Sequence, residues 1–91
     1  MPDWIGELTE LKELDVSWNK ITTLPDSICN LTKLRELNIY KNSGITKLPD
    51  KIGNLDALQV LNISYTGITE LPASIYALDL KEFRMYGLPI K

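Results

Sequence analysis

Apolar residues recur along the chain with a period of about 23 residues. The phase is set by four prolines at spacings of 23, 24 and 23 residues, namely Pro2, Pro25, Pro49 and Pro72. An isoleucine stands three positions after each proline and a leucine three positions later, which gives Ile5, Ile28, Ile52 and Ile75, then Leu8, Leu31, Leu55 and Leu78. Apolar residues spaced by three suit a helical or 3₁₀ segment with one apolar face. Each unit is therefore predicted to begin with a short helical segment.

A second apolar pattern follows in each unit, with residues two positions apart. It consists of Leu14 and Val16, Leu37 and Ile39, Leu61 and Ile63, and, one residue early, Phe83 and Met85. Residues two apart lie on one face of a β-strand. One unit cannot bury its own apolar face, so stability must come from stacking neighbouring units. The pattern predicts one solenoid domain over residues 1–91, with repeats at about 2–24, 25–48 and 49–71 and an irregular repeat at 72–91.

Asparagine occupies a fixed position in the first two units. Asn19 and Asn42 each stand three residues after the last apolar residue of a predicted strand. Buried polar side chains need hydrogen-bond partners, so we expect both asparagines to point inward and bond the backbone of adjacent turns. Thr66 replaces the third asparagine and Leu88 falls near the fourth position, so this series fades toward the C-terminus.

The repeating unit resembles the Ras-group class of intracellular leucine-rich-repeat proteins. Residues 24–49 match it best, from Leu24-Pro25 through Asn42 to Leu48-Pro49, and the resemblance extends over about residues 2–88. It implies an α/β solenoid with a curved parallel sheet on the concave side and short helical or 3₁₀ segments on the convex side. It also implies a scaffold or recognition role. The chain lacks the Leu-x-Gly-x-Ile-Pro pattern of plant receptor ectodomains, which favours the intracellular branch.

Composition indicates the cellular compartment and excludes some classes of partner. The net charge is −2 and basic residues form no run, so nucleic acid is not an expected partner. No apolar run approaches the roughly 20 residues that span a bilayer, so no membrane association is expected. The sequence begins without the basic start and apolar stretch of a signal peptide, and its single cysteine, Cys29, permits no internal disulfide. These features predict a cytoplasmic protein.

Catalysis is not expected. The chain has no histidine, which excludes Ser-His-Asp and Cys-His arrangements, and one cysteine without histidine excludes the usual zinc patterns. No Gly-Lys-Ser/Thr phosphate-binding motif occurs, and the carboxylates form no evident acid–base pair. Cys29 falls on the convex side, where we expect a surface or half-buried thiol. We predict a non-enzyme without cofactor or metal.

Candidate binding residues follow from the register of the strands on the concave face. They are Asp15, Ser17, Trp18, Asn38, Tyr40, Lys41, Asn62, Ser64, Tyr65, Arg84 and Tyr86. Four of them are aromatic and fall near the C-terminal ends of the strands, and Trp and Tyr are enriched at binding hot spots. The alternative is that these rings cover the core edge or fill gaps between strands. Lys12 and Arg35 stand beside Glu13 and Glu36, so their charges should largely cancel.

The predicted function is a module that binds a protein partner through the concave face and adjacent loops. Four short strands make a face of only a few hundred Å², below the roughly 800 Å² per partner of a standard interface, so the face alone should bind weakly. The alternatives are a self-associating solenoid and the recognition or targeting fragment of a larger signalling protein. Trp4, where other units have Ser27, Lys51 and Ser74, is predicted to shield the N-terminal end of the core; the alternatives are that it marks a self-association surface or is exposed by truncation.

Overall fold

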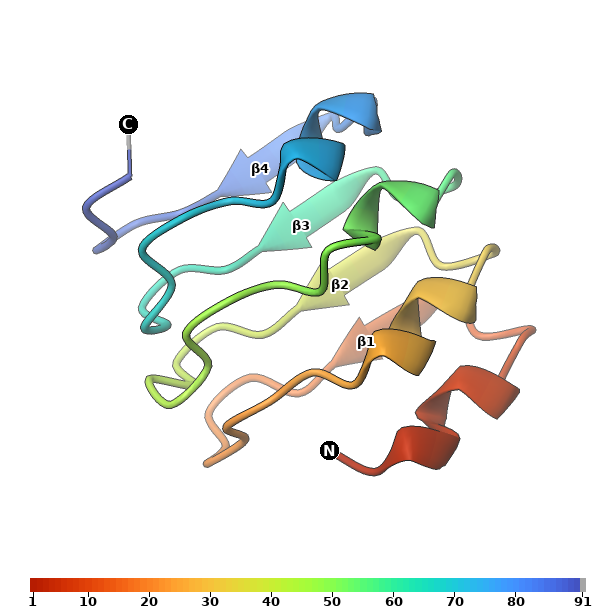
Figure 1. Cartoon of the computed structure of the whole chain (residues 1–91), viewed down its shortest axis with the longest axis horizontal. Helices are drawn as coiled ribbons and strands as arrows, with labels where there is room; N and C mark the ends of the chain where they lie inside the picture. The colour runs from red at the N-terminus through yellow and green to blue at the C-terminus, as the bar shows by residue number, and fades with distance from the viewer. Residues whose placement is uncertain (91) are drawn as a thin grey trace.

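The computed structural model describes residues 1–90 and shows a solenoid of four turns (Figure 1). Each turn consists of a short 3₁₀ helix followed by a three-residue strand. In chain order the elements are η1 (Asp3–Glu7), β1 (Glu13–Asp15), η2 (Asp26–Asn30), β2 (Glu36–Asn38), η3 (Ile52–Asn54), β3 (Val60–Asn62), η4 (Ala73–Ala77) and β4 (Glu82–Arg84). The predicted architecture is confirmed, and the helical segments are 3₁₀ helices. Lys91, the last residue of the predicted fourth repeat, lies outside the described residues.

The four strands form one parallel sheet in the order β1-β2-β3-β4. Leu37 pairs in register with Leu14 on one side and Leu61 on the other, and Leu61 pairs with Phe83. The fourth turn reaches this register although its apolar residues come one position early. The shortening falls just after η4, where Leu78 has an extended backbone with ψ of 139°, whereas the equivalent leucines of the other turns have ψ of 60°, 67° and 71°.

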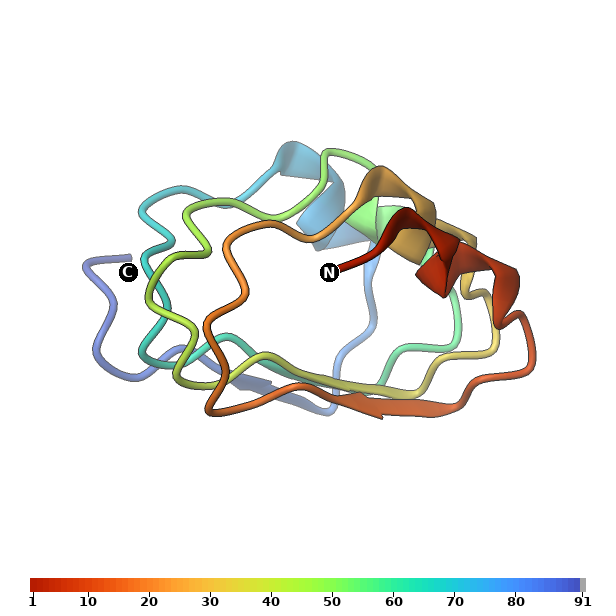
Figure 2. The same ribbon diagram turned by 90° about the horizontal axis from the view of Figure 1, so that it is seen from below.

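The 3₁₀ helices lie on the side of the coil opposite the sheet, as Figure 2 shows. Pro2, Pro25 and Pro72 stand at the N-caps of η1, η2 and η4 with extended backbones. Proline suits this place because its fixed φ and missing N–H cost little at a helix start. The third helix begins later, with Lys51 at its N-cap. Each helix buries one isoleucine toward the sheet, at positions 5, 28, 52 and 75.

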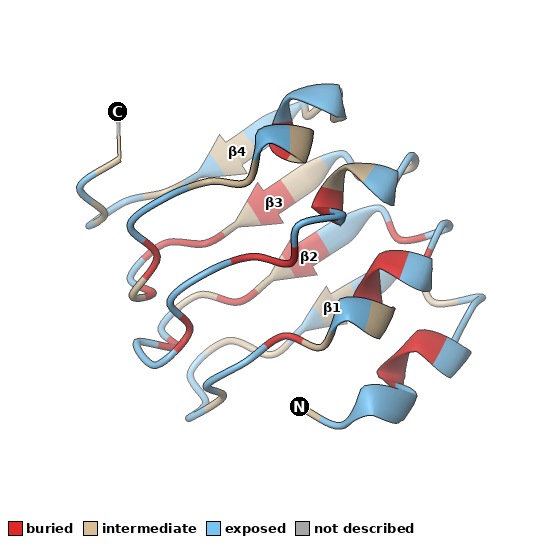
Figure 3. Cartoon of the chain, viewed as in Figure 1, coloured by how far each residue is buried: buried red, intermediate tan, exposed pale blue. Residues whose placement is uncertain are grey.

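Burial is complete in the two middle turns and partial in the two end turns (Figure 3). Leu37 and Ile39 are fully buried, whereas the equivalent Leu14 and Val16 of the first turn are only half-buried. Phe83 and Met85 are likewise half-buried in the fourth turn. A turn at the end of the stack has one neighbour instead of two, so one side of its core residues stays open.

The two predicted inward asparagines behave differently. Asn42 is fully buried and its side chain bridges two turns: its amide nitrogen donates to the carbonyl oxygens of Val16 and Ile39, both at 2.9 Å, and its oxygen accepts from Ile21 N–H at 3.2 Å. The prediction is confirmed for Asn42. It is wrong for Asn19, which is exposed and bonds only the carbonyl oxygens of its own turn, because among residues 1–90 no other turn packs against that side of the first one.

Thr66 replaces the asparagine in the third turn with fewer bonds. Its buried hydroxyl donates to the carbonyl oxygen of Ile63 at 2.8 Å, and it accepts a long bond from Ile68 N–H at 3.4 Å. Both partners belong to its own turn. The asparagine bridge between turns is therefore made once, by Asn42.

The convex helices are packed tightly in two places. A Cβ added to Gly6 would lie 2.5 Å from the carbonyl oxygen of Ser27, and a Cβ on Gly53 would clash in the same way with Ser74. Hydrogen bonds from the serine hydroxyls join the adjacent turns at these contacts: Ser27 Oγ donates to Asp3 O and Ser74 Oγ to Asp50 O, both at 2.6 Å. Glycine is required at these points because adjacent backbones approach too closely for a side chain.

Trp4 does not shield the end of the core as predicted. It occupies the serine position of these convex contacts, but among residues 1–90 no other helix lies on that side of η1. Its side chain remains 57% exposed, and the neighbouring Leu8 is 43% exposed. The half-buried residues that do pack against the N-terminal end of the core include Met1, Leu11 and Leu14.

Candidate protein-binding surface

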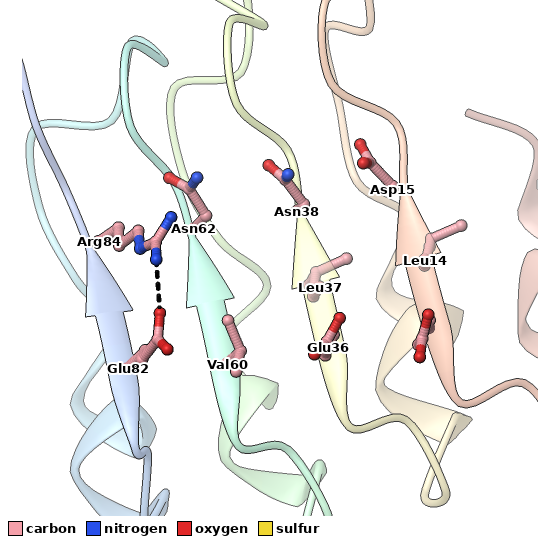
Figure 4. A pocket seen from close by; sticks show the side chains of 10 residues that line it. Leu14, Asp15, Glu36, Leu37, Asn38, Val60, Asn62, Glu82 and Arg84 are labelled. Atoms are coloured by element: carbon pink, nitrogen blue, oxygen red, sulfur yellow. Dashed lines mark ion pairs between the residues drawn. The ribbon is translucent and has the colours of Figure 1, made fainter.

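The outward face of the sheet forms a hollow lined by side chains from all four strands (Figure 4). The lining residues are Glu13, Leu14, Asp15, Glu36, Leu37, Asn38, Val60, Asn62, Glu82 and Arg84. The first and third residues of each strand point to this side because successive side chains alternate across a strand. Predicted binding residues Asp15, Asn38, Asn62 and Arg84 all lie here.

Among residues 1–90, one ion pair forms on this face. Arg84 Nη2 lies 2.8 Å from the carboxylate of Glu82, and the second ion pair among residues 1–90 joins Lys33 to Glu10, away from the hollow. Glu13 and Glu36 are exposed and form no ion pair with Lys12 or Arg35 within this part of the chain. Glu13 and Glu36 are therefore carboxylates without a contact ion pair, on a face that also carries the neutral amides of Asn38 and Asn62.

Three of the predicted binding residues shape the backbone just beyond the strands. Asp15 Oδ1 accepts from Ser17 N–H at 2.9 Å, Asn38 Oδ1 from Tyr40 N–H at 3.0 Å, and Asn62 Oδ1 from Ser64 N–H at 3.0 Å. Such bonds, two residues along the chain, are the Asx-turns that Asp and Asn favour. Much of the hydrogen-bonding capacity of these side chains is thus used within each turn, and arginine takes the same place in the fourth turn.

The carboxylate of Asp15 is held in its ionised form by this arrangement. The Ser17 hydroxyl donates to Asp15 Oδ1 at 2.6 Å, and this bond together with the backbone bond lowers the pKa of Asp15 from its usual 3.8. Hydrogen bonds to the charged form stabilise it. The contribution is present at neutral pH and is lost as the pH falls through the lowered pKa.

The Asx-turns lead into a row of residues with left-handed backbone. Trp18, Lys41 and Tyr65 have φ of 59°, 61° and 54°, and Gly87 has φ of 74° in the equivalent place. Non-glycine residues rarely adopt positive φ. The same bend in successive turns brings the side chains of positions 18, 41 and 65 out beside one another at the C-terminal side of the sheet.

These side chains form one cluster, which we call the aromatic ledge: Trp18, Tyr40, Lys41 and Tyr65. The ring centroids of Trp18 and Tyr40 are 5.6 Å apart at a tilt of 59°, and those of Tyr40 and Tyr65 are 5.6 Å apart in an edge-on arrangement at 85°. The ammonium nitrogen of Lys41 lies 5.3 Å from the Trp18 centroid and 4.7 Å from the Tyr65 centroid. Edge-on ring pairs and cation–π contacts at these distances are favourable.

The remaining predicted residues fall into different roles. Ser64 is fully buried and its hydroxyl accepts from Tyr86 N–H at 3.0 Å, so its prediction as a solvent-facing residue is wrong. The bond joins Ser64 to the next turn, to which Tyr86 belongs. Ser17 is half-buried and bonds Asp15. Tyr86 is 65% exposed and adds a fourth ring to this side, although the ring contacts of the described residues do not include it.

Gly87 supports the ledge from below the Tyr65 ring, and the sequence analysis did not identify it as a candidate. A Cβ at this position would lie 2.5 Å from Cδ1 and Cε1 of Tyr65, so the Tyr65 ring lies directly over the glycine backbone. Its positive φ also favours glycine. The signal available in the sequence was its alignment with Trp18, Lys41 and Tyr65 in the repeat.

Replacing Gly87 with alanine is expected to displace the Tyr65 ring. Ring currents of Trp18 and Tyr65 should shift the Lys41 ε-protons upfield in the NMR spectrum, and in Gly87→Ala these shifts should fall toward random-coil values. Backbone strain should also lower the free energy of unfolding by about 1–2 kcal/mol. Pro89→Ala, at an exposed position in the same loop, should leave the Lys41 resonances unchanged. Retention of the shifts in Gly87→Ala would show that Gly87 does not support the ledge.

The rest of the described chain offers little reactive chemistry. Cys29 is buried on the convex side, more deeply than expected, and burial raises the pKa of its thiol to about 11, with Asp26 adding to the effect. The thiol is therefore protonated at neutral pH. Residues 1–90 contain no group of three or more potential metal ligands, and no helix among them has the length and apolar character needed to cross a bilayer.

Comparison with family models decides the family. One leucine rich repeat model matches residues 1–43, and a second matches residues 57–78. The chain is a leucine-rich-repeat protein. A comparison with curated proteins gave no significant match.

Solved structures agree with this assignment. The leucine-rich-repeat chain is similar to protein LIC12759 of Leptospira interrogans, with a TM-score of 0.89 and 34% identity over 97% of the chain. It is also similar to a chain of the PEPR1-AtPEP1 crystal structure, with a TM-score of 0.81 and 33% identity over 97% of the chain. It spans only 22% and 13% of the lengths of these two chains.

Proposed function

We propose that this leucine-rich-repeat chain is a protein-binding module whose contact surface combines the hollow of the sheet with the aromatic ledge and Tyr86. Leucine-rich-repeat modules typically bind proteins. The similarity to a chain of the PEPR1-AtPEP1 structure supports this general role without identifying the partner. No catalytic step forms part of the proposal.

The observation that carries the proposal is the exposure of large rings beside the hollow. Trp18 is 71% exposed, Tyr86 65% and Tyr65 44%. Contiguous exposed apolar surface on a soluble protein marks an interaction site more often than chance placement does. Tyr and Trp add large contact area and a polar atom, which is why they are frequent hot-spot residues.

The ledge also enlarges the contact area, which is too small on the sheet face alone. The sheet is four strands wide and three residues long, so its face offers only a few hundred Å², against roughly 800 Å² per partner for a standard interface. Because the ledge continues this face past the strand ends, a partner that covers both gains area and reaches the rings. The sheet hollow alone should bind weakly.

The proposal includes a finer assignment of subtype and setting. The Leu-Pro-x-x-Ile units favour the Ras-group subtype, and a single cysteine, which permits no internal disulfide, suits a reducing compartment such as the cytoplasm. A role as the recognition part of a larger signalling protein is compatible with the small share of the similar structures that the chain spans.

The test compares two folded variants in capture of partners from a lysate of the native cells, followed by titration of the captured protein. The first variant carries Trp18→Ser, Tyr65→Ser and Tyr86→Ser, the most exposed rings of the proposed surface. The control is Tyr76→Ser, which removes an 84% exposed tyrosine from η4 on the opposite layer. We expect the triple variant to bind the captured protein at least about tenfold more weakly and the control to bind it unchanged.

Two other outcomes would place the binding surface elsewhere on the chain. Equal binding by the triple variant and the parent chain would move the contact surface away from the ledge and sink the proposal. Capture of the chain itself as the sole partner would favour self-association, for which the exposed Trp4 and Leu8 at the N-terminal turn offer a surface. Circular dichroism of each variant checks that lost binding does not reflect unfolding.

A further inference from the structure

The ammonium group of Lys41 lies between two aromatic rings that come from different turns. Trp18 follows β1 and Tyr65 follows β3, while Lys41 belongs to the turn between them. The nitrogen is 5.3 Å from one centroid and 4.7 Å from the other. Rings in alternate turns are separated by about twice the 4.8 Å strand spacing, which is room for one cation in contact with both.

Tyr40 packs against both outer rings. Its centroid is 5.6 Å from that of Trp18 and 5.6 Å from that of Tyr65, and it is half-buried where the two outer rings are exposed. Two rings therefore lie at cation–π distance from the ammonium group, and the third ring packs against both of them. Aromatic cages of this composition are the structures that bind quaternary ammonium and methylated lysine groups.

We propose that Trp18, Tyr40 and Tyr65 form a cage for a cationic group of a binding partner, and that Lys41 fills this cage in the free chain as an internal ligand. The ligand class is a weakly hydrated cation, namely a methylated ammonium or a guanidinium carried on a partner side chain. The role of a partner rests on the proposed function, whereas cation binding by the cage is a property of the chain alone.

Lys41 is suited to leave the cage. It is exposed, it takes part in neither of the two ion pairs found in residues 1–90, and its long side chain can extend into water. A primary ammonium is strongly hydrated, so it gains little from the rings, whereas guanidinium and quaternary ammonium groups lose less hydration on entering. Two cations cannot share the cage, so an incoming group must displace Lys41.

The cage is held in shape before any ligand arrives. The Asx-turns of Asn38 and Asn62 fix the backbone that leads to Tyr40 and Tyr65, and the Tyr65 ring lies over Gly87. Preformed walls reduce the ordering cost of binding. The half-buried Tyr40 ring contacts both outer rings, and the 71% exposed Trp18 leaves the cage open to solvent.

The test removes the internal ligand and supplies a small cation. The chain has two tryptophans, so Trp4→Phe leaves Trp18 as the single tryptophan reporter. Choline and its uncharged analogue 3,3-dimethylbutan-1-ol, which has the same shape, are titrated into Trp4→Phe and Trp4→Phe/Lys41→Asn while Trp18 fluorescence is followed. Asparagine tolerates the left-handed backbone at position 41. The control is Trp4→Phe/Lys47→Asn, at an exposed lysine outside the cage.

We expect the Lys41→Asn variant to bind choline saturably, with a dissociation constant at least about tenfold lower than that of the parent or of the Lys47→Asn control. A tenfold ratio corresponds to about 1.4 kcal/mol of binding free energy. The uncharged analogue should bind markedly more weakly. Equal binding of the two ligands would reduce the site to an apolar patch and overturn the cage, as would absence of saturable quenching by choline. If Lys41→Asn does not fold, Lys41→Gly, which also suits positive φ, gives the same readout.

The choline titration tests the cage and the capture experiment tests the protein-binding module, so either hypothesis can fail without the other. A captured protein that needs Trp18 and Tyr65, together with no choline binding by Lys41→Asn, would leave the protein-binding module in place and remove the cage. Choline binding by Lys41→Asn without any captured protein would do the reverse.

Discussion

Replacing Asn42 with alanine is expected to lower the free energy of unfolding by about 2–4 kcal/mol. The asparagine is fully buried and joins the first two turns through Val16 O, Ile39 O and Ile21 N–H. Alanine would leave these backbone groups without their side-chain partner at a position that is itself fully buried. Each unsatisfied buried group costs about 1–3 kcal/mol, and the loss should be cooperative because the bridged turns stabilise each other.

Urea unfolding followed by circular dichroism measures this loss, and the chain supplies its own control. Asn19→Ala removes the equivalent asparagine of the first turn, which is exposed and bonds only Val16 O and Ser17 O within its own turn. Water can replace these bonds, so the change should stay below about 1 kcal/mol. Equal losses in the two variants would show that the bridge between turns contributes nothing beyond local turn structure.

Replacing Gly53 with alanine is expected to cost about 1–3 kcal/mol, although glycine-to-alanine changes often stabilise helices. The added Cβ would lie 2.9 Å from the Cβ of Ser74 and closer still to the Ser74 carbonyl oxygen. That oxygen belongs to the backbone of η4, so the clash can be relieved only by moving one helix away from the other. The bond from Gly53 N–H to Ser74 Oγ, now 3.0 Å, would lengthen as well.

Gly44→Ala is the matched control for this prediction. Its added Cβ would come within 3.0 Å of Cγ2 of Thr22, the end of an exposed side chain that can rotate away. Reduced freedom of the unfolded chain should offset this contact, so the free energy of unfolding should change by less than about 1 kcal/mol. A Gly53→Ala variant as stable as Gly44→Ala would mean that the helices can separate without cost.

The fold could be predicted because each repeat encodes its own geometry. Spacing by three before Leu31 and by two from Leu37 to Ile39 specifies a helical segment and a strand, and repetition specifies the stack. The same reasoning found the buried role of Asn42. It failed for Asn19 and Trp4, because their surroundings depend on a second neighbouring turn, which the first turn does not have among residues 1–90.

The surface was harder to predict than the core. The sequence indicated aromatic side chains near the strand ends, but not that Lys41 would lie between Trp18 and Tyr65. That contact depends on left-handed backbone at all three positions, which neither hydrophobic spacing nor residue type reveals. Ser64 was misplaced because its hydroxyl accepts from Tyr86 N–H of the next turn, a contact that residue spacing does not reveal.

The sequence by itself determined the order of elements, the inward row through Leu37 and Leu61, and the face on which the candidate binding residues lie. These follow from local periodicity, because a strand alternates its side chains whatever surrounds it. The tertiary structure alone decided the contacts between turns: the bridge of Asn42, the close approach of Gly53 to Ser74, and the rings around Lys41. These contacts join residues more than 20 positions apart, and their distances depend on how each turn is set against the next.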